Sequence, residues 1–324
     1  MTQLNDKMSF MNKKLVPVIL FSLFALASCT KTARVVPDPV TPDPTAGYTY
    51  SMSSIYNSLK NLPKTVTINP AIGGSFYGNS GTKYTFPANA FQTPSGGSVV
   101  GNIQLDVIEY VKRGDMIFSR VLPVSNGDAL VSGGELSVTA SQAGAKLVMK
   151  PGVTFTAQVP QLGVISTGMQ AYYGQTVNTT TSPIDWYLGG VSALGAATCF
   201  GDTVTITSDS VGLVSAGHLL SSPSYQSFTV TVNGVTFDDS DHVQAYALYD
   251  NYRVAYPMMS RYHQKFSETH VASLPLHFVV YTVYHGDFYG GISTNTQTPL
   301  TGGNYTVNLT KVNPITFLDQ VNAL

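Results

Sequence analysis

Hydrophobic and polar residues alternate in short runs from residue 65 onward, and Gly, Pro, Asn and Asp separate the runs. Alternation with a period of two is typical of β-strands that bury one face, and the separating residues are those that turns require. Such runs lie at residues 65–68, 83–86, 99–110, 116–122, 134–140, 146–149 and 153–159. Seven short strands within about 95 residues predict an antiparallel β-sandwich over residues 65–160.

The same pattern returns later in the chain, at residues 203–207, 227–232, 242–247, 253–258, 276–285, 288–292 and 305–309. It predicts a second, immunoglobulin-like β-sandwich over residues 196–324, where Asn233-Gly234 is typical of a tight hairpin turn. Residues 161–195 are rich in Gly, Thr and Ser, contain the only tryptophan, Trp186, and are expected to connect the two sandwiches. The predicted fold class is all-β, with two antiparallel β-sandwich domains.

Two stretches follow a helical period instead. Apolar residues at positions 52, 55, 56 and 59 form one stripe that Pro63 ends, which predicts a short helix within residues 47–64 that packs on the first sandwich. Near the end of the chain, Pro314 precedes Phe317, Leu318 and Val321, which share one side of a predicted helix. We expect this second helix to dock on the second sandwich.

The first 28 residues have a different pattern. An apolar run at residues 15–26 follows Lys13 and Lys14, and Ser28 and Cys29 come soon after it. The run is shorter than the roughly 20 apolar residues that a transmembrane helix needs, so it predicts a secretory signal peptide. Residues 26–29 (Leu-Ala-Ser-Cys) resemble a bacterial lipobox, which implies cleavage after Ser28 and lipid attachment to Cys29. The alternative is an ordinary secretory leader with an incidental cysteine.

Residues 29–46 are expected to form a lipidated tether. They contain four prolines and two aspartates and almost nothing that could be buried. Pro-rich segments favour an extended chain of about 3.1 Å per residue, so the tether would hold the folded part away from the bilayer. Thr30 and Lys31 do not indicate whether that part faces the periplasm or the cell surface.

The charged residues of the chain narrow the classes of partner that it can bind. Without residues 1–28 the chain has 14 basic and 17 acidic residues, a net charge of −3, and no basic cluster. Nucleic-acid binding needs a basic face that displaces counterions from phosphates, so we expect no nucleic-acid partner. If Cys29 carries lipid, Cys199 has no second cysteine to pair with. Its apolar neighbours predict a small buried side chain rather than a reactive thiol.

Five segments carry a resemblance: residues 73–76 (Gly-Gly-Ser-Phe), 84–91 (Tyr-Thr-Phe-Pro-Ala-Asn-Ala-Phe), 101–110, 133–136 (Gly-Gly-Glu-Leu) and 147–152 (Leu-Val-Met-Lys-Pro-Gly). This succession resembles the β-sandwich module shared by zonula occludens proteins, netrin receptors and ankyrins. The module behind a lipobox and tether is also similar to uncharacterised lipoproteins of the Bacteroidetes type. Some relatives cleave themselves at a His-Phe-Ser step, but here Val279 follows His277-Phe278. The resemblance implies a fold and an outer-membrane location rather than a reaction.

Candidate chemistry is sparse along the chain. His277 and His285 would lie about 26 Å apart on one strand, and His263 and His270 fall in a predicted loop, so we expect no metal and no cofactor. Residues 238–241 (Asp-Asp-Ser-Asp) could join a Ca²⁺ site, although a solvated turn is the commoner outcome. No nucleophile, phosphate or dinucleotide motif occurs. A carboxylate pair depends on spatial separation and cannot be assigned from the sequence.

The strongest sign of binding is aromatic. Eleven aromatic residues lie between Tyr246 and Tyr289, both included. A tyrosine ring offers an apolar face and a hydroxyl that can stay hydrated, which suits stacking on a sugar or a place at a protein interface. Packing within the sandwich is the expected role of Phe278. For the predicted loop residues Tyr249, Tyr252 and Tyr262, binding and packing are equally consistent with the sequence, and we take these three as candidate binding residues.

Taken together, these patterns predict a lipid-anchored outer-membrane lipoprotein of the cell envelope. Its expected role is a binding or scaffold module for an envelope protein or a glycan, without catalysis. The alternative is a glycan-processing enzyme whose acidic residues the sequence does not place.

Overall fold

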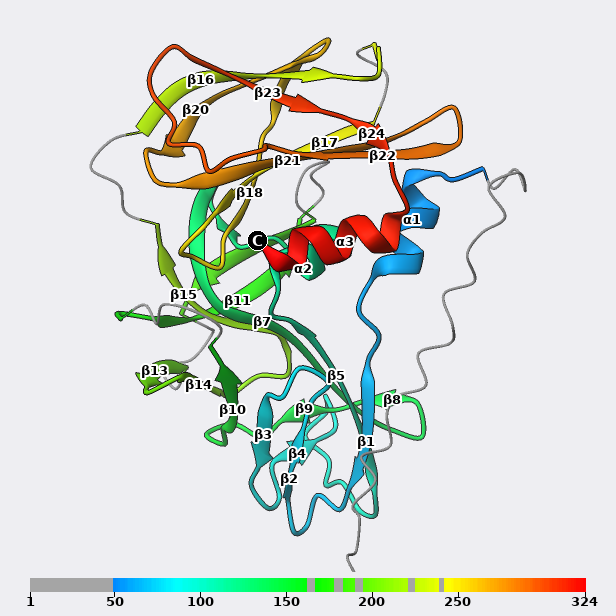
Figure 1. Cartoon of the computed structure of the whole chain (residues 1–324). Helices are drawn as coiled ribbons and strands as arrows, with labels where there is room; N and C mark the ends of the chain where they lie inside the picture. Colours follow the sequence, from blue (N-terminus) through cyan, green and yellow to red (C-terminus); the bar gives the residue numbers. More distant parts are fainter. Residues whose placement is uncertain (1–48, 162–166, 178–182, 190–194, 221–224, 239–241) are drawn as a thin grey trace, which may run out of the picture. The chain divides into compact units, whose positions relative to one another are not determined.

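A computed structural model describes residues 49–161, 167–177, 183–189, 195–220, 225–238 and 242–324 of the chain (Figure 1). The expected leader with Ser28, and the tether with Cys29, lie outside these residues. All described residues belong to one compact unit, Tyr48–Leu324. Strands make up 53% of the structure and helices 10%, which confirms the predicted all-β fold with short helices.

The first sandwich is built on a large antiparallel sheet with the strand order β1–β5–β7–β15–β11–β12. Its strands are β1 (Lys64–Ile68), β5 (Ile103–Tyr110), β7 (Asp128–Gln142), β11 (Gln170–Thr176), β12 (Ile184–Leu188) and β15 (Gly212–Leu219). Two short strands, β6 (Val124–Ser125) and β8 (Ala145–Lys146), also pair with β7.

A second sheet faces the first, with the strand order β13–β14–β10–β3–β2. Its strands are β2 (Gly74–Tyr77), β3 (Lys83–Phe86), β10 (Phe155–Pro160), β13 (Ala196–Phe200) and β14 (Thr203–Ser208). A separate pair joins β4 (Phe91–Gln92) to β9 (Val148–Met149). Val159 of β10 and Val204 of β14 lie against Gly134 and Gly133 of β7, so the two sheets meet in a shared core.

Strand pairing does not follow the expected division of the chain. Strands β11 and β12 lie inside the expected connector 161–195. Strands β13, β14 and β15 lie inside the expected second sandwich 196–324. All five strands nevertheless join the sheets of the first sandwich. The reason is the central strand β7, whose second edge would stay unpaired without β15. Trp186 of β12 is fully buried, and its Nε1 donates to the Leu122 carbonyl at 2.9 Å.

The second sandwich has two sheets, β19–β20–β16–β23 and β18–β17–β21–β22–β24. Their strands are β16 (Tyr225–Asn233), β17 (Val243–Tyr249), β18 (Ala255–Pro257), β19 (Ser260–Tyr262), β20 (Lys265–Ala272), β21 (Leu276–Tyr284), β22 (Asp287–Ile292), β23 (Gly303–Asn308) and β24 (Thr310–Lys311). The rings of Phe228 and Phe278, one from each sheet, lie 5.4 Å apart.

Two details of the second sandwich correct the sequence analysis. Strands β16 and β23 are parallel, so this sandwich is not wholly antiparallel. The expected hairpin at Asn233-Gly234 does not form, because β16 pairs with β20 and β23 instead of the next segment. Gly234 has a φ of +99° and passes so close to the Leu309 carbonyl that a Cβ would collide with it.

The two predicted helices are present. Helix α1 (Met52–Leu59) begins at Ser51, whose side chain accepts from the Ser54 amide, and buries Ile55 and Leu59. Helix α3 (Pro314–Ala323) begins at Asn313 and buries Phe317 and Val321. Helix α3 packs on β22, as expected, whereas α1 packs mainly on α2 and α3 rather than on the first sandwich.

Residues 116–122 were predicted as a strand, and this prediction is wrong. They belong mostly to a third helix, α2 (Arg113–Ser119), which ends where Arg120 adopts a φ of +57°. Met116, Ile117 and Phe118 are all fully buried. A helix that is buried on every side has no polar face, so its sequence lacks the helical period and reads as a short apolar run.

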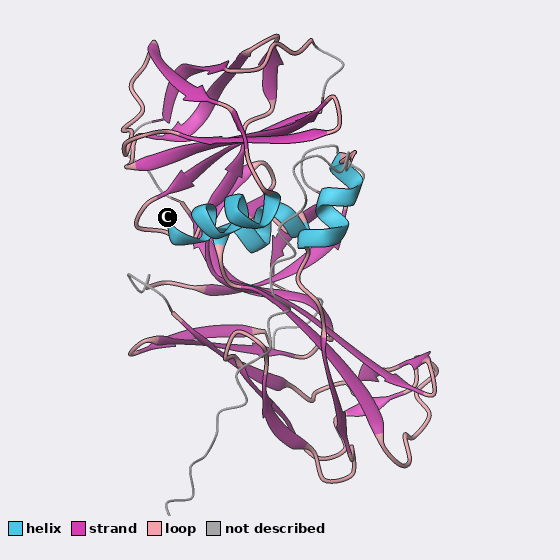
Figure 2. Ribbon diagram, turned by 45° about the vertical axis from the view of Figure 1, so that its right-hand side comes forward, coloured by secondary structure: helices cyan, strands magenta, loops and turns pink. Residues whose placement is uncertain are grey.

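The three helices lie between the two sandwiches (Figures 1 and 2). Phe118 of α2 reaches the second sandwich, where its ring lies 4.9 Å from Tyr281. One continuous core therefore includes buried residues of both sandwiches and all three helices. The chain enters this core at Tyr50, whose amide donates to the Gly286 carbonyl at the turn between β21 and β22. No helix in the described ranges is long and apolar enough to cross a membrane.

Candidate functional site

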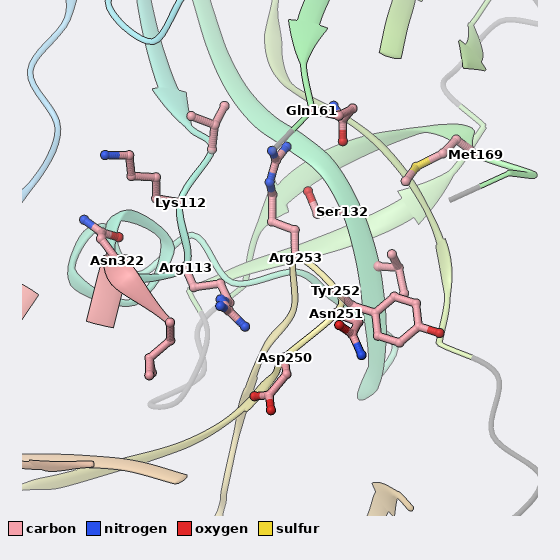
Figure 3. Close-up of a pocket in the computed structure, with 13 residues that line it drawn as sticks. Lys112, Arg113, Ser132, Gln161, Met169, Asp250, Asn251, Tyr252, Arg253 and Asn322 are labelled. Carbon is pink, nitrogen blue, oxygen red and sulfur yellow. The ribbon is translucent and has the colours of Figure 1, made fainter. Parts of the chain in front are cut away.

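A cavity of about 340 Å³ lies at the junction of the two sandwiches (Figure 3). Three segments supply most of its wall: the start of α2, the first third of β7, and the loop between β17 and β18. Its lining residues are Val111, Lys112, Arg113, Val131, Ser132, Gln161, Met169, Asp250, Asn251, Tyr252, Arg253, Asn322 and Leu324.

Two glycines of β7 allow the wall to form. Gly134 has a φ of +125°, and a Cβ there would lie 2.9 Å from Val159 and 3.4 Å from the Arg253 guanidinium. With no side chain in the way, Arg253 Nη1 donates to the Gly133 carbonyl at 2.7 Å, and Gln161 Nε2 donates to the same carbonyl at 2.9 Å. The Gly-Gly step thus lets two polar side chains from other segments lie directly on the strand.

Glu135 is the next residue of β7, and it is fully buried. Neither carboxylate oxygen has a hydrogen-bond partner of normal geometry. Burial raises the pKa of Glu135 to about 8, and the nearby Ser132 hydroxyl and Arg253 guanidinium offset this only in part. At neutral pH the carboxyl group is therefore mostly protonated, and it does not neutralise the charge of Arg253.

Arg113 and Asp250 form the opposite side of the cavity. Arg113 Nη1 donates to the Tyr249 carbonyl at 2.6 Å. Asp250 is held by two other residues, since its Oδ1 lies 2.7 Å from His277 Nδ1 and its Oδ2 accepts from the Thr296 hydroxyl at 2.7 Å. Burial lowers the pKa of the Arg113 guanidinium, and the charge of Asp250 opposes that shift.

Hydrogen bonds between the segments fix the shape of the cavity. The Ser132 amide donates to the Arg253 carbonyl at 3.0 Å, which ties the β17–β18 loop to β7. At the other wall, Asn322 of α3 accepts from the Gly114 amide at 2.9 Å and donates to Asp115 at 3.3 Å. Both walls are thus held by main-chain and side-chain contacts between distant parts of the chain.

The three candidate tyrosines are not brought together. Tyr249 is the last residue of β17 and is buried, and its hydroxyl accepts from the Ala272 amide at 2.9 Å, so the prediction that it is a loop residue is wrong. Tyr262 ends β19 with 69% of its surface exposed, and its ring centre lies 4.2 Å from that of His263 with the two rings tilted by 60°. Only Tyr252 lines the cavity. Phe278 is fully buried, as expected for a packing residue.

Sequence reasoning missed the charged residues of the site. Arg113 and Arg253 are 140 positions apart, and no local pattern links them. Glu135 did leave a signal, because an acidic residue inside the apolar strand 134–140 is unusual for a buried position.

A second hollow lies on the second sandwich and has a volume of about 500 Å³. His263 and His285 line it together with Asp238, and both histidines have positive φ. Within the described ranges, no group of three His, Cys, Asp or Glu residues is placed to hold a metal ion. Most of the Asp-Asp-Ser-Asp stretch, residues 239–241, lies outside those ranges. His270 belongs to strand β20 rather than to a loop.

Cys199 lies on strand β13 and is half-buried, and burial raises the pKa of its thiol. A raised pKa lowers the fraction of reactive thiolate at neutral pH. The expected full burial of Cys199 is not observed, because the side chain is half-buried.

No protein-family model matches this chain, and no curated protein matches it either. The ligand chemistry of the junction cavity is therefore inferred from its lining residues alone. Its lining combines three cationic side chains, amide side chains and one tyrosine ring, and Asp250 is the one acidic side chain among the lining residues that the structure describes.

Proposed function

We propose that this protein is a lipid-anchored outer-membrane protein that binds a glycan in the junction cavity without changing it chemically. The composition of the cavity carries this proposal. Tyr252 offers an aromatic face, and Gln161, Asn251 and Arg253 offer planar polar groups beside it. Saccharides present both apolar C–H faces and hydroxyl groups, which such a lining can satisfy together. The cavity volume also lies within the range of about 300–1,000 Å³ that is common for ligand sites.

The placement of the acids favours binding over catalysis. Glycoside hydrolysis generally needs two carboxyl groups about 5–9.5 Å apart that flank the substrate. Asp250 faces the cavity but is engaged by His277 and Thr296. Glu135 is fully buried behind the lining and is not part of it.

A glycan-processing enzyme is the second candidate, and Glu135 is the observation in its favour. A carboxyl group with a pKa of about 8 is protonated at neutral pH, as a general acid must be. Incubating the mature protein with envelope and dietary glycans, followed by product analysis, separates the two functions. Products that disappear in the Glu135→Gln variant would overturn the binding proposal.

The binding test uses the mature protein and a panel of immobilised glycans. We expect Tyr252→Ala to lower binding by about tenfold or more, because the ring forms one face of the cavity. Tyr262→Ala is the matched control, since it removes an exposed tyrosine from a different part of the same sandwich. Equal loss in both variants, or no binding to any glycan by the parent protein, would contradict the proposal.

The anchor is tested separately, because it depends only on the first 29 residues. Cys29→Ala should abolish incorporation of labelled fatty acid and release the protein from the membrane fraction, since two or more acyl chains are needed for stable anchoring. Cys199→Ala is the control, as it removes the other cysteine and should leave anchoring unchanged. Membrane retention of the Cys29 variant would indicate an ordinary leader and a different means of attachment.

A further inference from the structure

We propose that the junction cavity selects an acidic saccharide, and that Arg113 and Arg253, on different sides of the cavity, bind carboxylates of that saccharide. The inference rests on the proposed glycan-binding function and specifies its ligand class. Three observations support it: the cationic side chains that line the cavity, the few hydrogen bonds that the two guanidinium groups make within the protein, and the neutral polar and aromatic side chains beside them.

The charge of the cavity is unusual for this chain. Charged residues make up only 11% of the sequence. Three cationic side chains nevertheless line one cavity, Lys112, Arg113 and Arg253, against a single acidic side chain, Asp250. Burial lowers the pKa of the Arg253 guanidinium, the nearby Glu135 opposes this shift, and the charge of Arg113 adds to it. A cavity lined mostly by charges of one sign attracts an ion of the opposite sign.

Neither guanidinium group has its charge satisfied by an ion pair with any residue that the structure describes. Each donates from Nη1 to one main-chain carbonyl, Arg113 to Tyr249 and Arg253 to Gly133. A guanidinium group has five N–H donors, so most of this capacity is left for a ligand. Asp250 is already engaged by His277 and Thr296, and it cannot serve both arginines.

The orientation of these groups suits a ligand that spans the cavity. Figure 3 shows the Arg253 guanidinium beside Gln161, whereas Arg113 points toward Asp250 on the other side. Tyr252 and Asn251 lie on the remaining wall. A carboxylate accepts paired hydrogen bonds from arginine, and the ring and amides suit the body of a sugar. A uronic acid carries both features in one unit.

The test is calorimetric titration of the full mature protein with an oligogalacturonate and with the neutral galactose oligomer of the same length. We expect the acidic oligomer to bind at least about tenfold more tightly, which corresponds to about 1.4 kcal/mol. Raising NaCl from about 0.05 M to about 0.5 M should weaken only the acidic oligomer, because salt screens the charges of a partly exposed site.

Arg113→Gln and Arg253→Gln should each remove most of this preference. Lys146→Gln, an exposed lysine on β8, is the control and should not alter it. Both arginines also support the fold, so a further variant is needed. Lys112→Gln removes a lining charge from an exposed position. It should weaken binding of the acidic oligomer by a few-fold.

Three results would overturn the inference. Equal binding of the two oligomers, unaffected by salt, would remove the acidic preference but leave the proposed function intact. Displacement of the oligogalacturonate by an equal concentration of acetate would show a carboxylate site with no role for the sugar. Binding of neither oligomer, nor of any other glycan, would remove the proposed function as well.

Discussion

At the scale of single residues, the two buried glutamates of the large sheet have opposite environments. Glu109 on β5 accepts hydrogen bonds from the Ser80 and Thr82 amides at 2.6 and 3.0 Å. Glu135 on the neighbouring strand β7 has no such partner. Burial of a carboxylate without donors strongly disfavours its charged form, so Glu135 costs the fold stability whenever it ionises.

The pH dependence of stability should report this cost. The pKa of Glu135 rises from its ordinary value of 4.5 to about 8 on folding, so the folded protein holds this proton more tightly than the unfolded chain does. Its contribution is favourable at low pH, and stability should fall by about 1.4 kcal/mol per pH unit between about pH 4.5 and 8. Urea unfolding of the parent protein and of Glu135→Gln, compared at several pH values, isolates this effect. Parallel pH profiles for the two proteins would contradict it.

At the scale of elements, the sequence predicts segments that bury one face and fails for those that bury all faces. Strand β1 and helices α1 and α3 were all expected, because each shows a clear period of apolar residues. Helix α2 was missed because Met116, Ile117 and Phe118 are buried in succession. Residues 170–176 and 184–188 were missed as strands because Gly and Thr within and around them resemble a linker.

Helix α3 illustrates how much one buried aromatic ring contributes to the free energy of unfolding. Phe317 packs against Phe118, Tyr281 and Phe288, with ring centres 5.6 to 6.4 Å apart. Phe317→Ala should destabilise the protein by about 3–5 kcal/mol, because it opens a cavity where α2, α3 and the second sandwich meet. Ile315→Ala, two residues away on the exposed side, should change stability by less than about 0.5 kcal/mol. Denaturant unfolding measures the change in free energy of unfolding for both variants. Equal losses in the two variants would contradict the packing of Phe317 described here.

At the scale of the whole molecule, sequence spacing does not reveal which strands pair. The alternating runs locate many of the strands, but they do not indicate that β15 pairs with β7 across more than 70 residues. The same limit applies to the candidate site. Tyr252 could be selected from the sequence by residue type, whereas Arg113 and Arg253 line one cavity only because α2 packs against β18.

The continuous core predicts that the two sandwiches unfold together. Buried residues of both sandwiches and of all three helices belong to one cluster. Trp186 fluorescence reports on the first sandwich, because this single tryptophan is buried there in a smaller, second cluster with residues of β5, β7 and β11. We expect its thermal transition to coincide with that of the total strand signal in far-ultraviolet circular dichroism. Two separated transitions would show that the sandwiches are independent domains.

The bond between Tyr50 and Gly286 has a mechanical consequence for a protein held by its N-terminal end. If Cys29 is the anchor, tension along residues 29–46 would reach the fold first at this bond. It would then pass to α1, which precedes every strand that the structure describes. Each contact in this path would be loaded in turn rather than all at once. After the Tyr50–Gly286 bond breaks, helix α1 would therefore detach before any strand is pulled directly. The detached helix would lengthen the tether, and the cavity would keep its bound ligand.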